Sequence, residues 1–147
     1  MNTKQAILKF SLLAALTLTI CGCTSKEAKY SDVVQYAKDF LQISRDGSGE
    51  YQKTFYKYLD TTLPADLTQT WLNGMFIPWG KDPRSIIELT SLTVKKHKDH
   101  RLFSLKLSVT RISEQRYFNY KIDIKKSQKG MSITDFSAIE HKITPAE

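Results

Sequence analysis

Hydrophobic and polar positions follow two different periods in the two halves of the chain. In the first half, four apolar side chains recur at the three- and four-residue spacing of one helix face: Val33, Ala37, Phe40 and Leu41. Ser31 offers an N-cap before them, and Asp32 suits the positive start of a helix. This pattern predicts a helix over residues 31–44.

Two more helices are expected before residue 75. Arg45–Gly49 contains two glycines and breaks the first helix, after which a second apolar stripe runs to Leu59. Pro64 then suits the first turn of a third helix. The stripe of this third helix is Leu67, Trp71 and Leu72. Asn73 and Gly74 are expected to stop it.

The second half of the chain changes to a period of two, which is typical of half-buried strands. Four segments are expected to form strands: 86–96, 103–110, 118–125 and 131–139. In the last of these the alternation breaks near Asp135, which indicates a bulge. The polar connections between the segments are too short for parallel crossovers. We therefore expect an antiparallel four-stranded meander with one face covered by the helices.

This order of elements gives an α+β domain, with N-terminal helices packed on a curved four-stranded antiparallel sheet. It is similar to the cystatin-like and nuclear-transport-factor-2-like folds, over about residues 31–142. Bacterial lipoproteins with this architecture are known, and bridging subunits of type IV secretion and conjugation machines have extracytoplasmic domains that look like it. The fold hosts enzymes, ligand pockets and assembly modules, so it does not by itself decide the function.

The N-terminus has the features of a signal peptide. Lys4 and Lys9 form a positive region, and the apolar stretch Phe10–Ile20 has eleven residues. A membrane-spanning helix needs about 20 apolar residues. The stretch is therefore expected to be a cleaved leader and not a span.

The end of this leader resembles the lipobox of bacterial lipoproteins. Ile20 is the aliphatic residue at minus three, Gly22 the small residue at minus one, and Cys23 the cysteine that receives diacylglycerol. The resemblance implies cleavage between Gly22 and Cys23 and a membrane anchor through Cys23, because two acyl chains hold a protein on a bilayer. The alternative is an ordinary secretory signal with incidental cysteines.

Three segments follow from this interpretation. Residues 1–22 are the lipoprotein signal peptide, 23–30 are the lipidated cysteine and a polar tether, and 31–147 form a single α+β domain. The tether, Thr24–Tyr30, reaches about 24 Å when fully extended, at roughly 3.4 Å per residue. The domain is therefore expected close to the extracytoplasmic face of the cell membrane. Lys-rich, Arg-poor composition fits a Gram-positive host.

Charge is distributed unevenly along the chain, whose formal net charge is +7. The strand half, from residue 81, holds fourteen basic and eight acidic residues. In a meander, the first and third turns lie at the same end of the sheet, which brings two basic segments together. We expect these seven cations to form a candidate contact for an anionic surface: Lys95, Lys96, Lys98, Arg101, Lys125, Lys126 and Lys129. The alternative is a solvated basic end.

The segment between the third helix and the first strand is rich in aromatic residues. Trp71, Phe76 and Trp79 are the candidate partner-binding or pocket residues there, since Trp and Tyr dominate binding hot spots. Packing in the core is the competing interpretation. Four polar residues are candidates to join such a pocket: Asp66, Glu88, Tyr120 and Asp135.

The sequence contains few signs of catalysis. His97 and His100 have an H-x-x-H spacing, but neighbouring lysines would repel a divalent cation, so no metal site is expected. No nucleophile triad or glycine-rich phosphate loop is recognisable. No cofactor is expected. Nucleic-acid binding is not expected either, since basic residues and stacking aromatics are not interleaved.

The resulting hypothesis is a non-enzymatic lipoprotein that acts as a protein-binding or assembly module. The resemblance implies a role in conjugative transfer or secretion, as in a Gram-positive conjugal-transfer lipoprotein. A small-ligand-binding pocket protein or weak enzyme on the same fold is the alternative.

Overall fold

The computed structural model of this chain describes residues 22–43, 50–75, 85–111 and 116–142. The chain divides into two compact units, Met1–Ser31 and Asp32–Glu147. The predicted leader up to and including Cys21 lies outside the described residues, and its last residue, Gly22, is the first described one. No helix among the described ranges has both the length and the apolar character needed to cross a membrane.

In the first unit, the segment expected to be a tether is helical. Helix α2 runs from Gly22 to Lys29, and the N–H of Tyr30 continues it with a 3.0 Å bond to the carbonyl of Lys26. Lys26 and Lys29 lie in its last turn, where positive charge favours the helix dipole. Eight helical residues span about 12 Å, so the segment is shorter than an extended tether.

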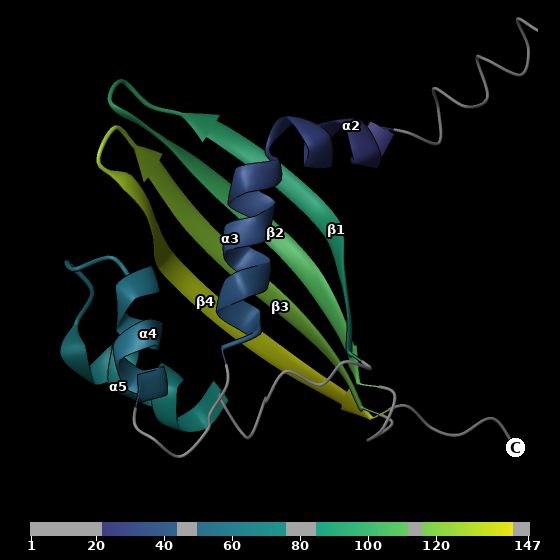
Figure 1. The fold of residues 1–147 in the computed structure, drawn as a ribbon, viewed down its shortest axis with the longest axis vertical. Helices are drawn as coiled ribbons and strands as arrows, with labels where there is room; N and C mark the ends of the chain where they lie inside the picture. Colours follow the sequence, from purple (N-terminus) through teal and green to yellow (C-terminus); the bar gives the residue numbers. More distant parts are fainter. Residues whose placement is uncertain (1–21, 44–49, 76–84, 112–115, 143–147) are drawn as a thin grey trace, which may run out of the picture. The chain divides into compact units, whose positions relative to one another are not determined.

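The three expected helices follow α2 along the chain (Figure 1). Helix α3 is Ser31–Leu41, α4 is Glu50–Tyr58 and α5 is Ala65–Met75. The predicted apolar stripe of α3 is fully buried. Helix α5 differs from its prediction at both ends, because it starts after Pro64 and continues through Asn73 and Gly74.

Local hydrogen bonds explain the extended end of α5. Gln69 donates from Nε2 to Oδ1 of Asn73 at 3.0 Å, a spacing of four residues that supports the helix. The buried stripe of α5 also differs, because Leu67 is 39% exposed while Thr68 takes a buried position beside Trp71 and Leu72. The buried face is therefore one residue further round the helix than expected.

The predicted meander is confirmed. Its strands are β1 (Ser85–Lys96), β2 (His100–Arg111), β3 (Arg116–Ser127) and β4 (Gly130–Lys142). They pair antiparallel in the order β1-β2-β3-β4. The break predicted near Asp135 is a register shift, because Asp123 pairs with Asp135 and Ile124 with Ile133, leaving one extra residue in β4. A second shift, after Leu89 in β1, was not predicted.

The helices cover one face of the sheet, which we call the helix side. Figure 1 shows α3 running along this face, with α4 and α5 beside β4. The strands contribute alternate buried residues to it: Leu92, Phe103, Leu105, Leu107, Val109, Phe118, Tyr120, Ile122, Ile124, Ile133 and Phe136. The opposite face, which we call the outer face, carries mostly polar residues. All buried residues of the described chain lie between Val33 and Phe136.

Candidate functional site at the hairpin end of the sheet

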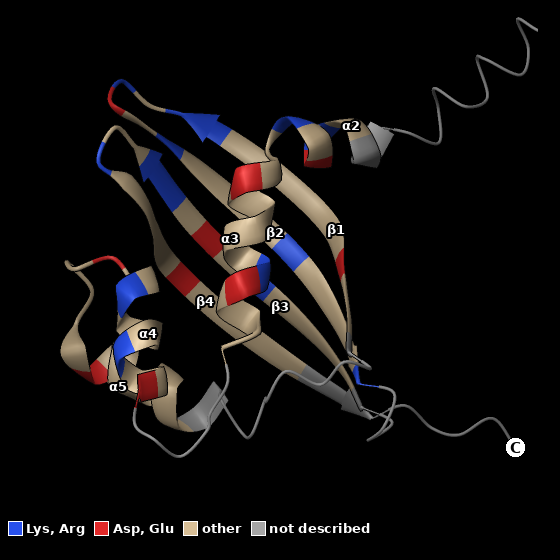
Figure 2. Cartoon of the chain, viewed as in Figure 1, with Lys and Arg blue, Asp and Glu red and all other residues tan. Residues whose placement is uncertain are grey.

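The sheet register brings the two basic segments together, as expected from a meander. His100 of β2 pairs with Ser127 of β3, so the β1–β2 and β3–β4 turns lie at the same end. We call this the hairpin end. Figure 2 shows Lys and Arg concentrated at both hairpin tips, and Asp or Glu in the first turn of α3. All seven predicted cations lie within this end of the second unit: Lys95, Lys96, Lys98, Arg101, Lys125, Lys126 and Lys129.

The seven cations occupy both faces of the sheet and both turns. Lys96, Arg101 and Lys126 are consecutive cross-strand partners, in a row on the helix side beyond the last core residues. Lys95 and Lys125 flank Leu102 in the neighbouring row, whose side chains point to the outer face. Lys98 and Lys129 lie in the two turns. The hairpin end is therefore basic on each side that solvent reaches.

Asp32 connects the start of α3 to this basic end. Its Oδ2 accepts a hydrogen bond from Nζ of Lys126, and its Oδ1 accepts one from the N–H of Val33 at 2.9 Å. The bond from Lys126 is the main reason why the pKa of Asp32 lies below its ordinary value. Both side chains remain partly exposed, at 43% for Lys126 and 49% for Asp32. The pair therefore adds little to stability, but it marks where α3 meets the sheet.

Tyr36 reinforces the same junction one turn further along α3. Its hydroxyl lies 3.0 Å from the carbonyl oxygens of Tyr58 and Met131, toward which it directs its single proton. Burial raises the pKa of Tyr36 to about 12, so the phenol stays protonated as a donor. The first two turns of α3 are thus held to β3 and β4 near the hairpin end.

The two histidines form a stacked pair at the β1–β2 turn. The rings of His97 and His100 are 4.6 Å apart at an interplanar angle of 10°, and Nδ1 of His100 is 2.6 Å from Oδ1 of Asp99. This contact lowers the pKa of Asp99 below its ordinary value. In the portion of the chain that the structure describes, no group of three or more His, Cys, Asp or Glu side chains is arranged to hold a metal ion.

A third carboxylate, Asp60, is occupied by neighbouring hydroxyl and amide groups. Its Oδ1 accepts bonds from the N–H and the hydroxyl of Thr62, at 2.9 and 2.6 Å, and its Oδ2 accepts one from Ser132 at 3.1 Å. Mainly because of the bonds from Thr62, the pKa of Asp60 lies below its ordinary value, with a smaller contribution from Lys125. The acidic groups near the hairpin end therefore already have partners.

Of the three aromatic candidates, the structure describes Trp71 alone. Trp71 is only 5% exposed, and its ring meets Phe136 edge-to-face with centroids 6.1 Å apart. Phe76 and Trp79 lie outside the described residues. Trp71 thus packs as part of the core of the second unit.

The polar residues considered for a pocket are separated by the sheet. Tyr120 is buried on the helix side, 3% exposed, and stacks on Phe136. Glu88 and Asp135 pair with Ser108 and Asp123 on the outer face, and both are exposed. Asp66 is exposed on α5. These groups do not converge on one site.

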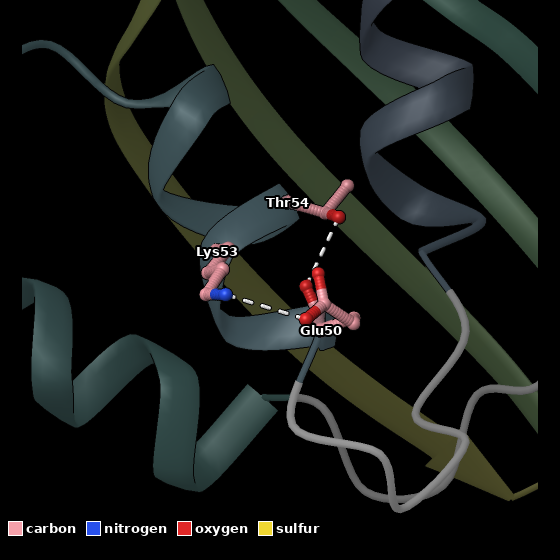
Figure 3. A network of polar contacts seen from close by, with 3 residues as sticks. All are labelled: Glu50, Lys53 and Thr54. Carbon is pink, nitrogen blue, oxygen red and sulfur yellow. Dashed lines mark hydrogen bonds and ion pairs between the residues drawn. The ribbon is translucent and has the colours of Figure 1, made fainter.

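The exposed polar contacts on α4 are local to that helix. Figure 3 shows Lys53 donating to Oε1 of Glu50 at 3.3 Å and the Thr54 hydroxyl donating to the Glu50 carbonyl at 3.1 Å. The side chains of Lys53 and Glu50 are 73% and 68% exposed. They stabilise one helical turn and do not add to the hairpin end.

Sequence reasoning located the cations but missed two features of their setting. The contact of Asp32 with Lys126 joins residues 94 positions apart, which no local pattern indicates. The helical conformation of Gly22–Lys29 was also missed, because its polar composition suggested a simple tether.

No protein-family model, curated protein or solved structure matches this chain.

Proposed function

We propose that this protein is a membrane-anchored extracytoplasmic lipoprotein whose folded part is a protein-binding or assembly module. One observation carries the proposal: Ile20, Gly22 and Cys23 stand in lipobox positions directly after a short apolar leader. Diacylglycerol on Cys23 would hold the mature chain on the membrane, because two acyl chains bind a bilayer stably. The membrane is thus its first partner and a protein its second.

The position of the core supports a lipid anchor that is separate from the folded module. The first buried residue, Val33, is ten positions beyond Cys23, and the segment between them carries no core side chain among residues 25–32. A lipid on Cys23 would therefore leave the packing of the second unit intact. The anchor and the folded module are chemically independent parts of one chain.

The filled helix side supports a binding module over a pocket protein. Phe136 meets rings from α3, α5 and β3, namely Phe40, Trp71 and Tyr120, with centroids 5.2, 6.1 and 5.5 Å away. Aromatic side chains therefore pack the space around Phe136 between these helices and the sheet. We further propose a cystatin-like or nuclear-transport-factor-2-like fold, similar to the extracytoplasmic domains of conjugation and type IV secretion machines.

Metabolic labelling with a fatty-acid analogue tests the anchor. We expect the wild-type chain and the matched Cys21→Ser variant to be labelled and to remain with the membrane fraction. Cys23→Ser should lose the label, because the thioether to diacylglycerol cannot form. Equal labelling of wild type and Cys23→Ser would refute the lipoprotein assignment.

Crosslinking in the native membrane, followed by mass spectrometry, tests the assembly module. We expect one or more extracytoplasmic or membrane proteins to be recovered with the wild-type chain and lost after Cys23→Ser. Recovery of the chain alone would count against the assembly function. A small molecule retained by the purified chain in native mass spectrometry would instead favour the alternative pocket function.

A further inference from the structure

The chain joins its folded unit at the basic hairpin end. Asp32, the first residue of the second unit, accepts a hydrogen bond from Lys126 next to the β3–β4 turn. Asp32 is nine positions from Cys23. Nine residues span about 14 Å as a helix and about 31 Å when extended. An anchor at Cys23 therefore keeps the hairpin end within that distance of the membrane surface.

We propose that the hairpin end is a membrane-contact surface that binds the headgroups of anionic phospholipids and thereby orients the domain on the bilayer. The proposal rests on the proposed lipid anchor for its location, but the binding itself belongs to the folded unit. The occupant is an anionic lipid, because the same end that carries the cations is the end nearest the attachment point. The opposite end of the sheet and the outer face then remain available for a protein partner.

The charges at the hairpin end are available for such contact. Among the described residues, no ion pair involves Lys95, Lys96, Lys98, Arg101 or Lys129, and all five side chains are exposed. The nearby carboxylates are already engaged, Asp32 with Lys126, Asp99 with His100, and Asp60 with Thr62 and Ser132. The excess positive charge therefore faces solvent.

Distance and screening favour lipid contact when the domain is anchored. The electrostatic field of an anionic leaflet decays within roughly 8 Å at physiological ionic strength, so a free protein feels it weakly. Each Lys or Arg near the surface increases membrane binding by about fivefold. The connection to Cys23, about 14 Å long as a helix and about 31 Å when extended, keeps the hairpin end close enough to enter this thin layer repeatedly, where several cations act together.

Vesicle sedimentation with residues 24–147 tests the binding without the anchor. This segment retains every buried residue of the described chain and carries no cysteine. We expect it to bind vesicles of phosphatidylcholine and phosphatidylglycerol in equal parts at low salt, and not vesicles of phosphatidylcholine alone. Rising salt should weaken the binding. No difference between the two vesicle types at low salt would overturn the proposal.

Two variants that lose the same number of positive charges test whether binding depends on the hairpin end or only on the net charge of the protein. The hairpin variant replaces four exposed lysines with Gln: Lys95, Lys96, Lys98 and Lys129. The control variant replaces four exposed lysines elsewhere: Lys53, Lys57, Lys106 and Lys121. We expect the hairpin variant to bind anionic vesicles about several hundredfold more weakly, at about fivefold for each lysine, and the control to bind nearly as wild type. Equal losses in both would overturn the proposal.

Thermal unfolding followed by circular dichroism checks that both variants fold. All eight substituted side chains are exposed, so their melting temperatures should stay near that of wild type. Should the hairpin variant fail to fold, single replacements of Lys98 and Lys129, which lie in the two turns, provide the same comparison with Lys106 and Lys121. Each single replacement should weaken binding by about fivefold only at the hairpin end.

Labelled single-cysteine variants test the orientation directly. Gln128→Cys places a polarity-sensitive dye in the β3–β4 turn, and Ser137→Cys places it on the outer face of β4; both positions are exposed. On anionic vesicles, the emission at position 128 should shift to the blue while that at position 137 stays unchanged. Equal shifts would overturn the orientation.

These outcomes are separable from those of the anchor. Loss of vesicle binding with retained fatty-acid labelling of Cys23 would refute only the membrane-contact surface. Vesicle binding without fatty-acid labelling would refute only the lipoprotein assignment. Binding of residues 24–147 to purified teichoic acid but not to anionic vesicles would assign the cations to a wall polymer and overturn the proposal.

Discussion

At the scale of single residues, Phe136 is the side chain on which the helices and the sheet converge. It is 3% exposed and stacks on Tyr120 at an interplanar angle of 7°, while Phe40 and Trp71 meet it edge-to-face. Such aromatic pairs contribute beyond the area they bury. One ring therefore couples α3, α5, β3 and β4.

Truncating this ring should strongly destabilise the domain. We expect Phe136→Ala to lower the free energy of unfolding by about 3–5 kcal/mol, because it removes the transfer free energy of the ring and leaves a cavity. Chemical denaturation of residues 24–147 measures the loss. Ile139→Ala is the matched control, since Ile139 is in the same strand but 61% exposed. A loss of the same size in both variants would contradict this role for Phe136.

Trp71 shows where residue-level prediction reaches its limit. A tryptophan on an amphipathic helix is consistent with both a core position and a binding hot spot, because the same apolar area serves either purpose. Only the placement of Phe136 beside it decides that Trp71 is buried. The alternation of Phe103, Leu105 and Leu107 carried no such ambiguity, since a strand has two faces and one must be covered.

At the scale of elements, the connection after α4 attaches the helices to the edge of the sheet. Leu59 forms a parallel bridge with Ile133, and the N–H of Asp60 donates to the Ile133 carbonyl at 2.9 Å. The Asp60 carboxylate then binds Thr62 and Ser132. This junction covers part of an edge strand that would otherwise present unpaired backbone groups.

The junction should make stability sensitive to acid. The ordinary pKa of an Asp side chain is 3.8. In the folded chain the pKa of Asp60 is lower, mainly because Thr62 donates to the ionised carboxylate. Its contribution is therefore present above pH 3.8 and is lost as the pH falls through the lower folded value. Asp60→Asn, which cannot ionise, should show a shallower loss of stability below pH 3.8 than wild type.

Denaturant unfolding at neutral and acidic pH measures this difference. Ser132→Ala removes the donor to Oδ2 but leaves a titratable carboxylate with its Thr62 bonds. Its acid dependence should therefore lie between those of wild type and Asp60→Asn. An unchanged acid dependence in Asp60→Asn would show that the junction does not couple to protonation.

The sequence predicts element boundaries well where the spacing of hydrophobic residues determines them. It predicts them poorly where a single hydrogen bond determines them. The four strands and their antiparallel order follow from alternation and short turns, and both are confirmed. The predicted end of α5 was wrong, because composition suggests a stop at Asn73 while the bond from Gln69 supports a helical Asn73. The shift after Leu89 was missed, since one extra residue in an edge strand barely disturbs a β-rich pattern.

At the scale of the whole molecule, apolar, polar and basic residues of the second unit lie on different surfaces. The helix side holds the core, the outer face is polar, and the hairpin end is basic. Sequence alone predicted the basic end, because a meander places alternate turns together. It could not predict that the chain joins the unit there, because the contact between Asp32 and Lys126 depends on how α3 lies on the sheet.

The long separations between packed partners also determine when the protein can fold during synthesis. Tyr36 reaches the carbonyl of Met131, 95 positions later, and the bridge from Leu59 closes only on Ile133. The helices are made first, but their contacts with the sheet stay incomplete until β4, the last strand, has emerged. Folding dominated by such distant contacts is slow. Nearly the whole chain must therefore be synthesised, and remain unfolded and accessible to proteases or chaperones, before its core can form.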